Sequence, residues 1–117
     1  EPPVHATVRF AENEMIYDGK TYKRGTPFAV SIAGANRDPE ANKNPNEFNI
    51  TREDIKHISF GYGPHMCIGA SLARIESRIA FECLFERFEN LELIDKNPLW
   101  GRNLIFRGFD NLKLKAS

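Results

Sequence analysis

The reactive side chains of this sequence gather in one short stretch, FGYGPHMCIG, which covers residues 60–69. It holds one of the two cysteines, Cys67, together with His65 and three glycines. So many glycines beside a proline favour a loop over a helix or a strand. A cysteine in such a loop, placed where a helix begins, gains thiolate character from nearby backbone N–H groups, so Cys67 is a candidate metal ligand or nucleophile. A structural alternative is that Cys67 is simply a small buried residue in a glycine-rich turn.

The segment after Cys67 carries the clearest periodicity in the sequence. Apolar residues recur at spacings of four, three and four at Ile68, Leu72, Ile75 and Ile79. This pattern predicts one long helix that ends near Asn90. The stretches ENLELI (89–94) and FDNLKLK (109–115) alternate in polarity, and we expect them to form short strands around a loop at residues 103–108.

The segment before the glycine loop contains the remaining predicted elements. The dipeptide Asp18-Gly19 predicts the tight turn of a β-hairpin within residues 7–22. We expect a short helix at residues 28–35, although an apolar run of this length also suits a buried strand. Residues 36–51 are dense in Asn, Asp and Pro and predict a long ordered loop, a kind of segment that is often functional.

Composition excludes several classes of function. The chain has 117 residues, of which 16 are basic and 16 acidic, and the two signs are interspersed, so nucleic acid is not an expected ligand. The longest apolar run, PFAVSIAGA, is too short to cross a bilayer, and no signal-peptide pattern is visible. We therefore expect a cytoplasmic protein without a membrane partner. Because the chain opens on Glu1-Pro2-Pro3, we expect it to be a segment of a longer protein.

The glycine loop resembles the haem-ligand loop of the cytochrome P450 family. The matching positions are Phe60, Gly61, Gly63, His65, Cys67 and Gly69. The resemblance extends to ASLARIE (70–76), which is similar to the helix that follows the ligand in soluble bacterial members. ANRDP (35–39) and NEFNITR (46–52) are similar to the irregular meander before the loop, and residues 1–4 to the end of a preceding helix. The resemblance implies that residues 1–117 are the carboxyl-terminal segment of a single P450 domain.

This resemblance implies a fold of mixed α and β type, the carboxyl-terminal portion of the mainly α P450 fold. Its expected order is hairpin, short helix, meander, cysteine loop, long helix and terminal β-hairpin. It implies haem b as cofactor, with Cys67 as the axial iron ligand and catalytic residue. His65 and Arg9 correspond to donors to the haem propionates, and the other expected haem contacts are Phe60, Gly61 and Gly69.

Further roles follow from the same resemblance. Substrate contacts are expected from Val4, His5, Val8, Leu104 and Ile105. Arg52 corresponds to an arginine that pairs with a helix absent from this chain, so we expect Arg52 to be unpaired. Cys83, within the long helix, is expected in the core. Arg74, Arg78 and Lys56 are expected to form a solvated face, with docking of a redox partner as the alternative.

The implied activity is a haem-thiolate monooxygenase that inserts one oxygen atom of dioxygen into a small organic substrate. Its electrons would come from a ferredoxin or a flavodoxin. The chain alone is expected to be inactive, because the helix that covers the other haem face in the family has no counterpart here. The alternative is a non-catalytic structural or swapped module without haem. A cysteine-based hydrolase is a third possibility, but the sequence shows no motif that pairs a histidine with an oxyanion-binding device.

Overall fold

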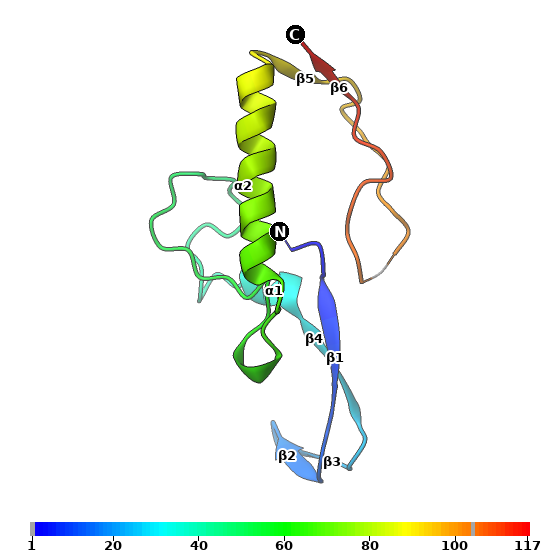
Figure 1. Ribbon diagram of the computed structural model, residues 1–117. Coiled ribbons are helices and arrows are strands. Elements are labelled where there is room, and N and C mark those ends of the chain that lie inside the picture. The colour runs from blue at the N-terminus through cyan, green and yellow to red at the C-terminus, as the bar shows by residue number, and fades with distance from the viewer. Residues whose placement is uncertain (1, 104) are drawn as a thin grey trace. The chain divides into compact units, whose positions relative to one another are not determined.

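The computed structural model (Figure 1) describes residues 2–103 and 105–117. These residues divide into two compact units. Unit 1 contains residues 2–59, 103 and 105–107, and unit 2 contains residues 60–102 and 108–117. The described elements, in chain order, are β1 (Ala6–Phe10), β2 (Met15–Tyr17), β3 (Lys20–Tyr22), β4 (Pro27–Ser31), α1 (Ile32–Asn36), a 3₁₀ turn (Gly63–His65), α2 (Ala70–Arg87), β5 (Leu91–Leu93) and β6 (Leu114–Ala116). This order confirms the mixed α and β architecture.

Unit 1 is built on two antiparallel strand pairs. In the pair β2–β3, the turn residues Asp18 and Gly19 have φ angles of 49° and 71°, as a type I′ hairpin turn requires. The predicted turn is therefore confirmed. Strand β1 pairs instead with β4, with Ala6 opposite Ser31, so residues 7–10 lie outside the hairpin expected over residues 7–22. This pairing joins segments about twenty residues apart, which local turn chemistry does not reveal.

The apolar run at residues 28–35 divides between β4 and α1. The short helix expected here is wrong for residues 28–31, which form most of β4, and right for the residues that follow. Ser31 explains the change, because its Oγ accepts a hydrogen bond from the N–H of Gly34 at 3.0 Å and caps the helix. The carbonyl of His5 also accepts the N–H groups of Ile32 (2.9 Å) and Ala33 (3.1 Å), which joins α1 to the strand region.

The long loop predicted at residues 36–51 begins at residue 37, after the end of α1, and the chain has no regular element up to residue 62. Asn36 connects the start of this segment to residues 58 and 59 within unit 1. Its Nδ2 donates to Ser59 Oγ at 3.0 Å, and its Oδ1 accepts the N–H of Ile58 at 2.8 Å. One side chain thus holds segments that are more than twenty residues apart.

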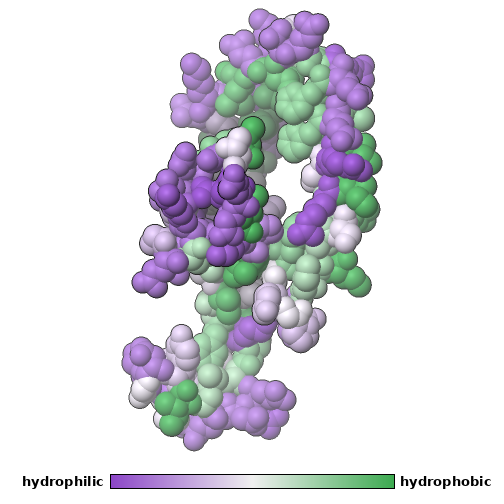
Figure 2. Space-filling model, turned by 90° about the vertical axis from the view of Figure 1, so that its left-hand side faces the viewer, coloured by the Kyte–Doolittle hydropathy of each residue, from purple (hydrophilic) through white to green (hydrophobic). Residues whose placement is uncertain are grey.

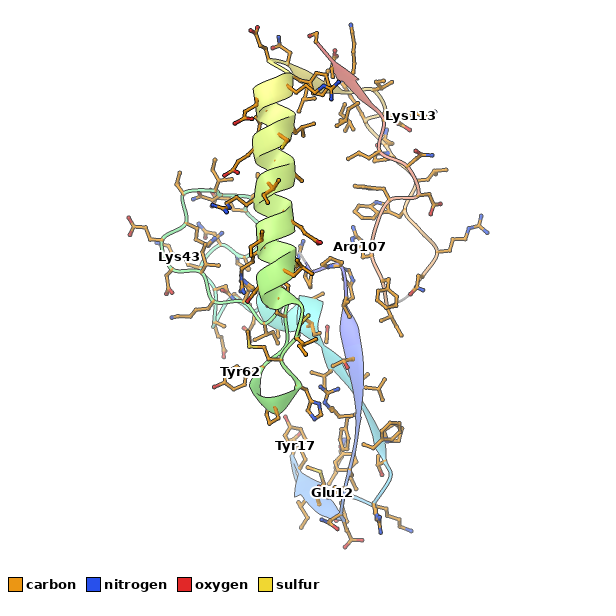
Figure 3. The ribbon with its side chains drawn as sticks, viewed as in Figure 1. Glu12, Tyr17, Lys43, Tyr62, Arg107 and Lys113 are labelled. Atoms are coloured by element: carbon orange, nitrogen blue, oxygen red, sulfur yellow. The ribbon has the colours of Figure 1, made fainter. Side chains whose placement is uncertain are left out.

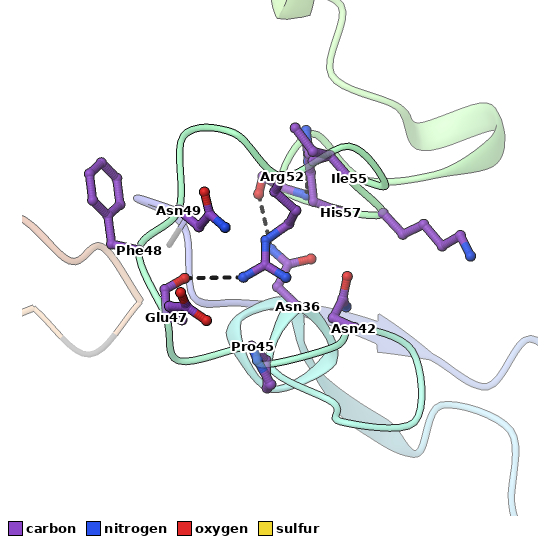
Figure 4. A pocket seen from close by; sticks show the side chains of 11 residues that line it. Asn36, Asn42, Pro45, Glu47, Phe48, Asn49, Arg52, Ile55 and His57 are labelled. Atoms are coloured by element: carbon purple, nitrogen blue, oxygen red, sulfur yellow. Dashed lines mark hydrogen bonds between the residues drawn. The ribbon is translucent and has the colours of Figure 1, made fainter.

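Arg52 organises the interior of this loop. Its guanidinium donates to the main-chain carbonyls of Lys43, Asn44 (3.0 Å) and Glu47 (3.1 Å), and Figure 4 shows it reaching toward Glu47. The prediction that Arg52 would be unpaired is therefore wrong. Five N–H donors on a planar group can satisfy several carbonyls of an irregular loop at once, so a helix partner is not required.

Unit 2 contains the one long helix and a terminal strand pair. The predicted helix is confirmed as α2, which ends at Arg87, three residues before Asn90. The predicted terminal strands are confirmed as β5 and β6, which pair antiparallel with Leu91 opposite Ala116. Between these strands, the ring centroids of Trp100 and Phe109 lie 4.0 Å apart. The two residues also form an antiparallel bridge, which joins the two sides of the connecting loop.

The described residues bury few hydrophobic side chains. The buried ones are Ala11, Ile32 and Ala70. On α2, the periodic apolar residues Leu72, Ile75 and Ile79 are 59%, 49% and 48% exposed. Apolar side chains are accordingly visible at the surface in Figure 2.

The predicted burial of Cys83 is wrong. The structure leaves its side chain exposed on α2. Periodicity predicts that the segment is helical, but burial depends on what packs against the helix.

Within the described residues, no helix combines the length and the apolar content that a membrane crossing requires.

Candidate functional site

The cysteine loop is closed on itself by a main-chain hydrogen bond. The N–H of Cys67 donates to the carbonyl of Phe60 at 2.7 Å, which brings the two ends of this segment together. Inside it, the 3₁₀ turn Gly63–His65 is closed by the N–H of Met66, which donates to the carbonyl of Gly63 at 3.0 Å. The loop thus has a defined backbone path around the candidate ligand.

Two glycines make this path possible. Gly61 has a φ of 75°, and a Cβ at this position would lie 3.2 Å from the carbonyl oxygen of His65. Gly63 has a φ of 70°, but no atom lies within 4 Å of a Cβ built there. Both positions require the left-handed region, which glycine adopts without strain, and only Gly61 also meets a steric limit.

The thiol of Cys67 is exposed, and Gly69 lies next to it. A Cβ built at Gly69 would lie 3.9 Å from Cys67 Sγ, so the glycine leaves this side of the sulfur open. The alternative in which Cys67 is a buried packing residue does not agree with this exposure. An accessible cysteine with open space beside its sulfur is suited to a ligand or nucleophile role.

Helix α2 begins slightly later than the sequence indicates. Its first residue is Ala70, three positions after Cys67, and the N–H of Ala70 donates to the carbonyl of Cys67 at 3.2 Å. The N–H of Ala73 donates to the carbonyl of Gly69 at 2.9 Å. Cys67 therefore belongs to the turn that leads into α2, and its carbonyl already takes part in that turn.

The other side chains of the loop differ in exposure. His65 is the last residue of the 3₁₀ turn and is exposed, so its imidazole is available to an anionic group. Tyr62 projects outward from the loop and is 88% exposed (Figure 3). Phe60, at the base of the loop, is half-buried.

Sequence reasoning missed one residue of this site, Arg74. Its Cζ lies 4.6 Å from the centre of the Phe60 ring, within the range of a cation–π contact. The sequence predicts that Arg74 lies with Arg78 and Lys56 on a solvated face. Its side chain is indeed exposed, but spacing along a helix does not reveal which aromatic ring beyond the helix an arginine meets.

The expected propionate donor Arg9 lies in unit 1, on β1. Its guanidinium donates to Thr7 Oγ1 at 2.9 Å and to the carbonyl of Val8 at 3.0 Å, and the residue is exposed. Because side chains alternate along a strand, Arg9 and Thr7 share one face of β1, and Val8 lies on the other. Val8, an expected substrate contact, is 48% exposed.

Two expected substrate segments lie side by side in unit 1. Val4 forms an antiparallel bridge with Phe106, and the N–H of His5 donates to the carbonyl of Ile105 at 2.8 Å. The side chain of Ile105 is 46% exposed. The remaining expected contact, Leu104, lies outside the described residues.

The expected site residues therefore divide between the units. Unit 2 brings together Phe60, Gly61, His65, Cys67 and Gly69. Unit 1 contains Val4, His5, Val8, Arg9 and Ile105. Within the described ranges, no three or more His, Cys, Asp or Glu side chains gather as a metal cluster. The exposed thiol of Cys67 would be enough to hold a haem, because cysteine-ligated haem iron takes one thiolate from the chain.

Comparison with known proteins decides the family. The family model described as Cytochrome P450 matches residues 1–103. This chain belongs to the cytochrome P450 family. The P450 chain is 41% identical over 118 aligned residues to the polyketide biosynthesis cytochrome P450 PksS of Bacillus subtilis, an alignment that covers 99% of this chain and 29% of PksS. It is 38% identical to 6-deoxyerythronolide B hydroxylase of Saccharopolyspora erythraea, with 97% of this chain and 28% of that protein covered.

Solved structures of P450 proteins also match this chain along nearly its whole length. The structure of PksS matches with a TM-score of 0.91 and covers 98% of this chain and 30% of PksS. A structure of P450BioI in complex with hexadec-9Z-enoic acid ligated acyl carrier protein also has a TM-score of 0.91, at 35% identity, and covers 100% of this chain and 30% of that one. The P450 chain thus spans about 30% of the length of these relatives.

Proposed function

We propose that this chain supplies the haem-thiolate loop of a monooxygenase, with Cys67 as the protein ligand of haem b. The observation that carries the proposal is the exposed Cys67 thiol in a closed glycine loop, in a chain of the P450 family. A thiolate ligand pushes electron density onto haem iron and favours O–O cleavage, which is the chemistry needed to insert one atom of dioxygen into an organic substrate.

The residues of the chain have distinct tasks in this proposal. Cys67 presents its sulfur, while the hydrogen bond from its N–H to Phe60 holds the loop closed. The exposed His65 and Arg9 would donate hydrogen bonds to the haem propionates, since cationic or neutral N–H donors pair well with carboxylates. Gly61 and Gly69 keep the backbone path and the space beside the sulfur free of side chains.

Substrate contact is proposed for the paired segments of unit 1. Val4 and His5 lie beside Ile105, and Val8 offers a further apolar side chain, as does Leu104 by position in the sequence. Similar proteins are named for polyketide biosynthesis or bind an acyl chain on a carrier protein. An organic, largely apolar substrate suits these side chains. Electrons would come from a ferredoxin or a flavodoxin.

The decisive experiment compares the two cysteines in the protein expressed at the full length its gene encodes. Cys67→Ser should abolish the red-shifted Soret band that a reduced haem-thiolate protein shows with carbon monoxide. Cys83→Ser is the matched control, because Cys83 is also an exposed cysteine of unit 2 but lies within α2. A red-shifted band retained in Cys67→Ser would exclude Cys67 as the ligand. Absence of the band in the unmodified protein would favour a structural module without haem.

A further inference from the structure

Arg74 contacts the base of the cysteine loop from the second turn of α2. Its Cζ lies 4.6 Å from the centre of the half-buried Phe60 ring. A guanidinium within about 6 Å of an aromatic ring centre is attracted by the negative face of the ring. Arg74 and Phe60 lie on opposite sides of Cys67 in the sequence, so their contact spans the loop that carries the candidate ligand.

Phe60 is also bonded to Cys67 through the main chain. The carbonyl of Phe60 accepts the Cys67 N–H at 2.7 Å, a short hydrogen bond for an amide donor. Directly after Phe60, the chain turns through Gly61, whose φ is 75°. Phe60 therefore both precedes this turn and supplies the acceptor for the Cys67 N–H.

The helix completes the connection from the other side. The carbonyl of Cys67 accepts the N–H of Ala70, the buried first residue of α2, and Arg74 follows Ala70 by one helical turn. Cys67 is thus held through its N–H by Phe60 and through its carbonyl by α2. The contact between the side chains of Arg74 and Phe60 links α2 to the start of the loop a second time, independently of the main chain.

We propose that Arg74 is a positioning residue for Cys67. It holds the Phe60 ring against α2 and thereby keeps the Cys67 N–H bonded to the Phe60 carbonyl. The relevance of this role to catalysis rests on the proposed haem ligation by Cys67. The geometric part concerns the loop alone and is tested without haem.

The first measurement is hydrogen exchange of the Cys67 amide in the full-length protein without haem. Arg74→Gln removes the cation but keeps a long polar side chain, and it should speed exchange of this amide about two- to fivefold, the factor that matches an exposed cation–π contact. Arg74→Lys keeps the cation and should restore most of the protection. Arg78→Gln is the matched control, because Arg78 is an exposed arginine one helical turn further along α2, and it should leave this amide unchanged.

The second measurement uses the haem-loaded protein. Arg74→Gln should increase the fraction of the reduced carbon monoxide complex that lacks the red-shifted band, and Arg74→Lys should return it toward the unmodified protein. Phe60→Leu should remove the effect of Arg74→Gln in the double variant, because the ring is then gone. If the unmodified protein shows no red-shifted band, the haem proposal fails, and the exchange data still decide the role of Arg74.

Two outcomes would overturn the inference. In one, Arg74→Gln and Arg78→Gln change neither amide exchange nor the spectrum, which leaves Arg74 as an ordinary surface charge. In the other, both variants slow electron delivery equally while the Cys67 amide stays protected, which assigns Arg74 to partner docking.

Discussion

The strongest quantitative prediction concerns the 117 residues expressed alone. The chain exposes 10509 Å² of surface, whereas a compact monomer of 13.4 kDa exposes about 6,500 Å² by the usual scaling with mass. Relative to an unfolded chain of about 19,000 Å², it buries about 45% of its surface, below the roughly 60% that even a 60-residue domain buries. An excess of about 4,000 Å² on one chain is more than one partner contributes to most obligate interfaces, which cover about 2,000–5,000 Å² counted over both partners.

This excess includes large apolar side chains. Ile68, Phe48 and Ile50 are 104%, 94% and 84% exposed, and the apolar positions of α2 are about half exposed. We therefore expect the isolated chain to associate, to bind a hydrophobic dye such as ANS, and to hold haem weakly and without a stable red-shifted band. Its urea m-value should be about 30% below that of an ordinary domain of the same mass, because m follows the area exposed on unfolding.

Sedimentation velocity, dye fluorescence and urea unfolding measure these properties on the same sample. Replacing Leu72, Ile75 and Ile79 together by Gln should reduce association and dye binding while α2 remains helical by circular dichroism, because Gln is a good helix former. A monodisperse monomer that binds no dye, unfolds cooperatively with an ordinary m-value and takes up haem stoichiometrically would refute the area argument.

Two further predictions concern the full-length protein, one on haem retention and one on the stability of the cysteine loop. His65→Ala and Arg9→Ala should each speed haem transfer to an acceptor protein about tenfold or more, since a hydrogen bond to a charged group contributes about 1.5–3 kcal/mol; unchanged transfer in both variants would count against propionate binding. Gly61→Ala should destabilise the loop by more than Gly63→Ala. Both place a Cβ at positive φ at a cost of about 1–2 kcal/mol, but only the first also meets a carbonyl oxygen at 3.2 Å. Equal thermal shifts would show that this contact relaxes freely.

The parts of the fold that sequence predicts well are those set by local chemistry. Asp18-Gly19 forms its turn because both residues tolerate positive φ, and the apolar spacing from Leu72 to Ile79 yields a helix whatever covers it. The sequence is less informative where contacts between distant residues determine the structure. Strand β1 pairs with β4 rather than within the local hairpin, and Ser31 divides the apolar run into strand and helix by capping α1.

The same distinction applies to the candidate site. The loop around Cys67 was recognisable because glycine positions and a cysteine carry strong backbone and chemical constraints. The roles of Arg52 and Arg74 were not, because an arginine side chain is long and can reach many acceptors. Arg52 meets three main-chain carbonyls and Arg74 meets an aromatic ring, and neither partner follows from the identity of the residue. Exposure of Cys83 was missed because burial depends on neighbours rather than on helical phase.

Asn36 also bears on how this part of the chain can change during evolution. Its side-chain amide is hydrogen-bonded to Ile58 and Ser59, near the end of the long loop. The two ends of the intervening segment are therefore held close together at fixed positions. The entropic cost of closing a loop rises only slowly with its length. Insertions and deletions should therefore be accepted in residues 53–57, beyond the carbonyls that Arg52 binds, and selected against in residues 43–52. Related genes can then diversify this surface segment in length while the cysteine loop that follows it keeps its starting point.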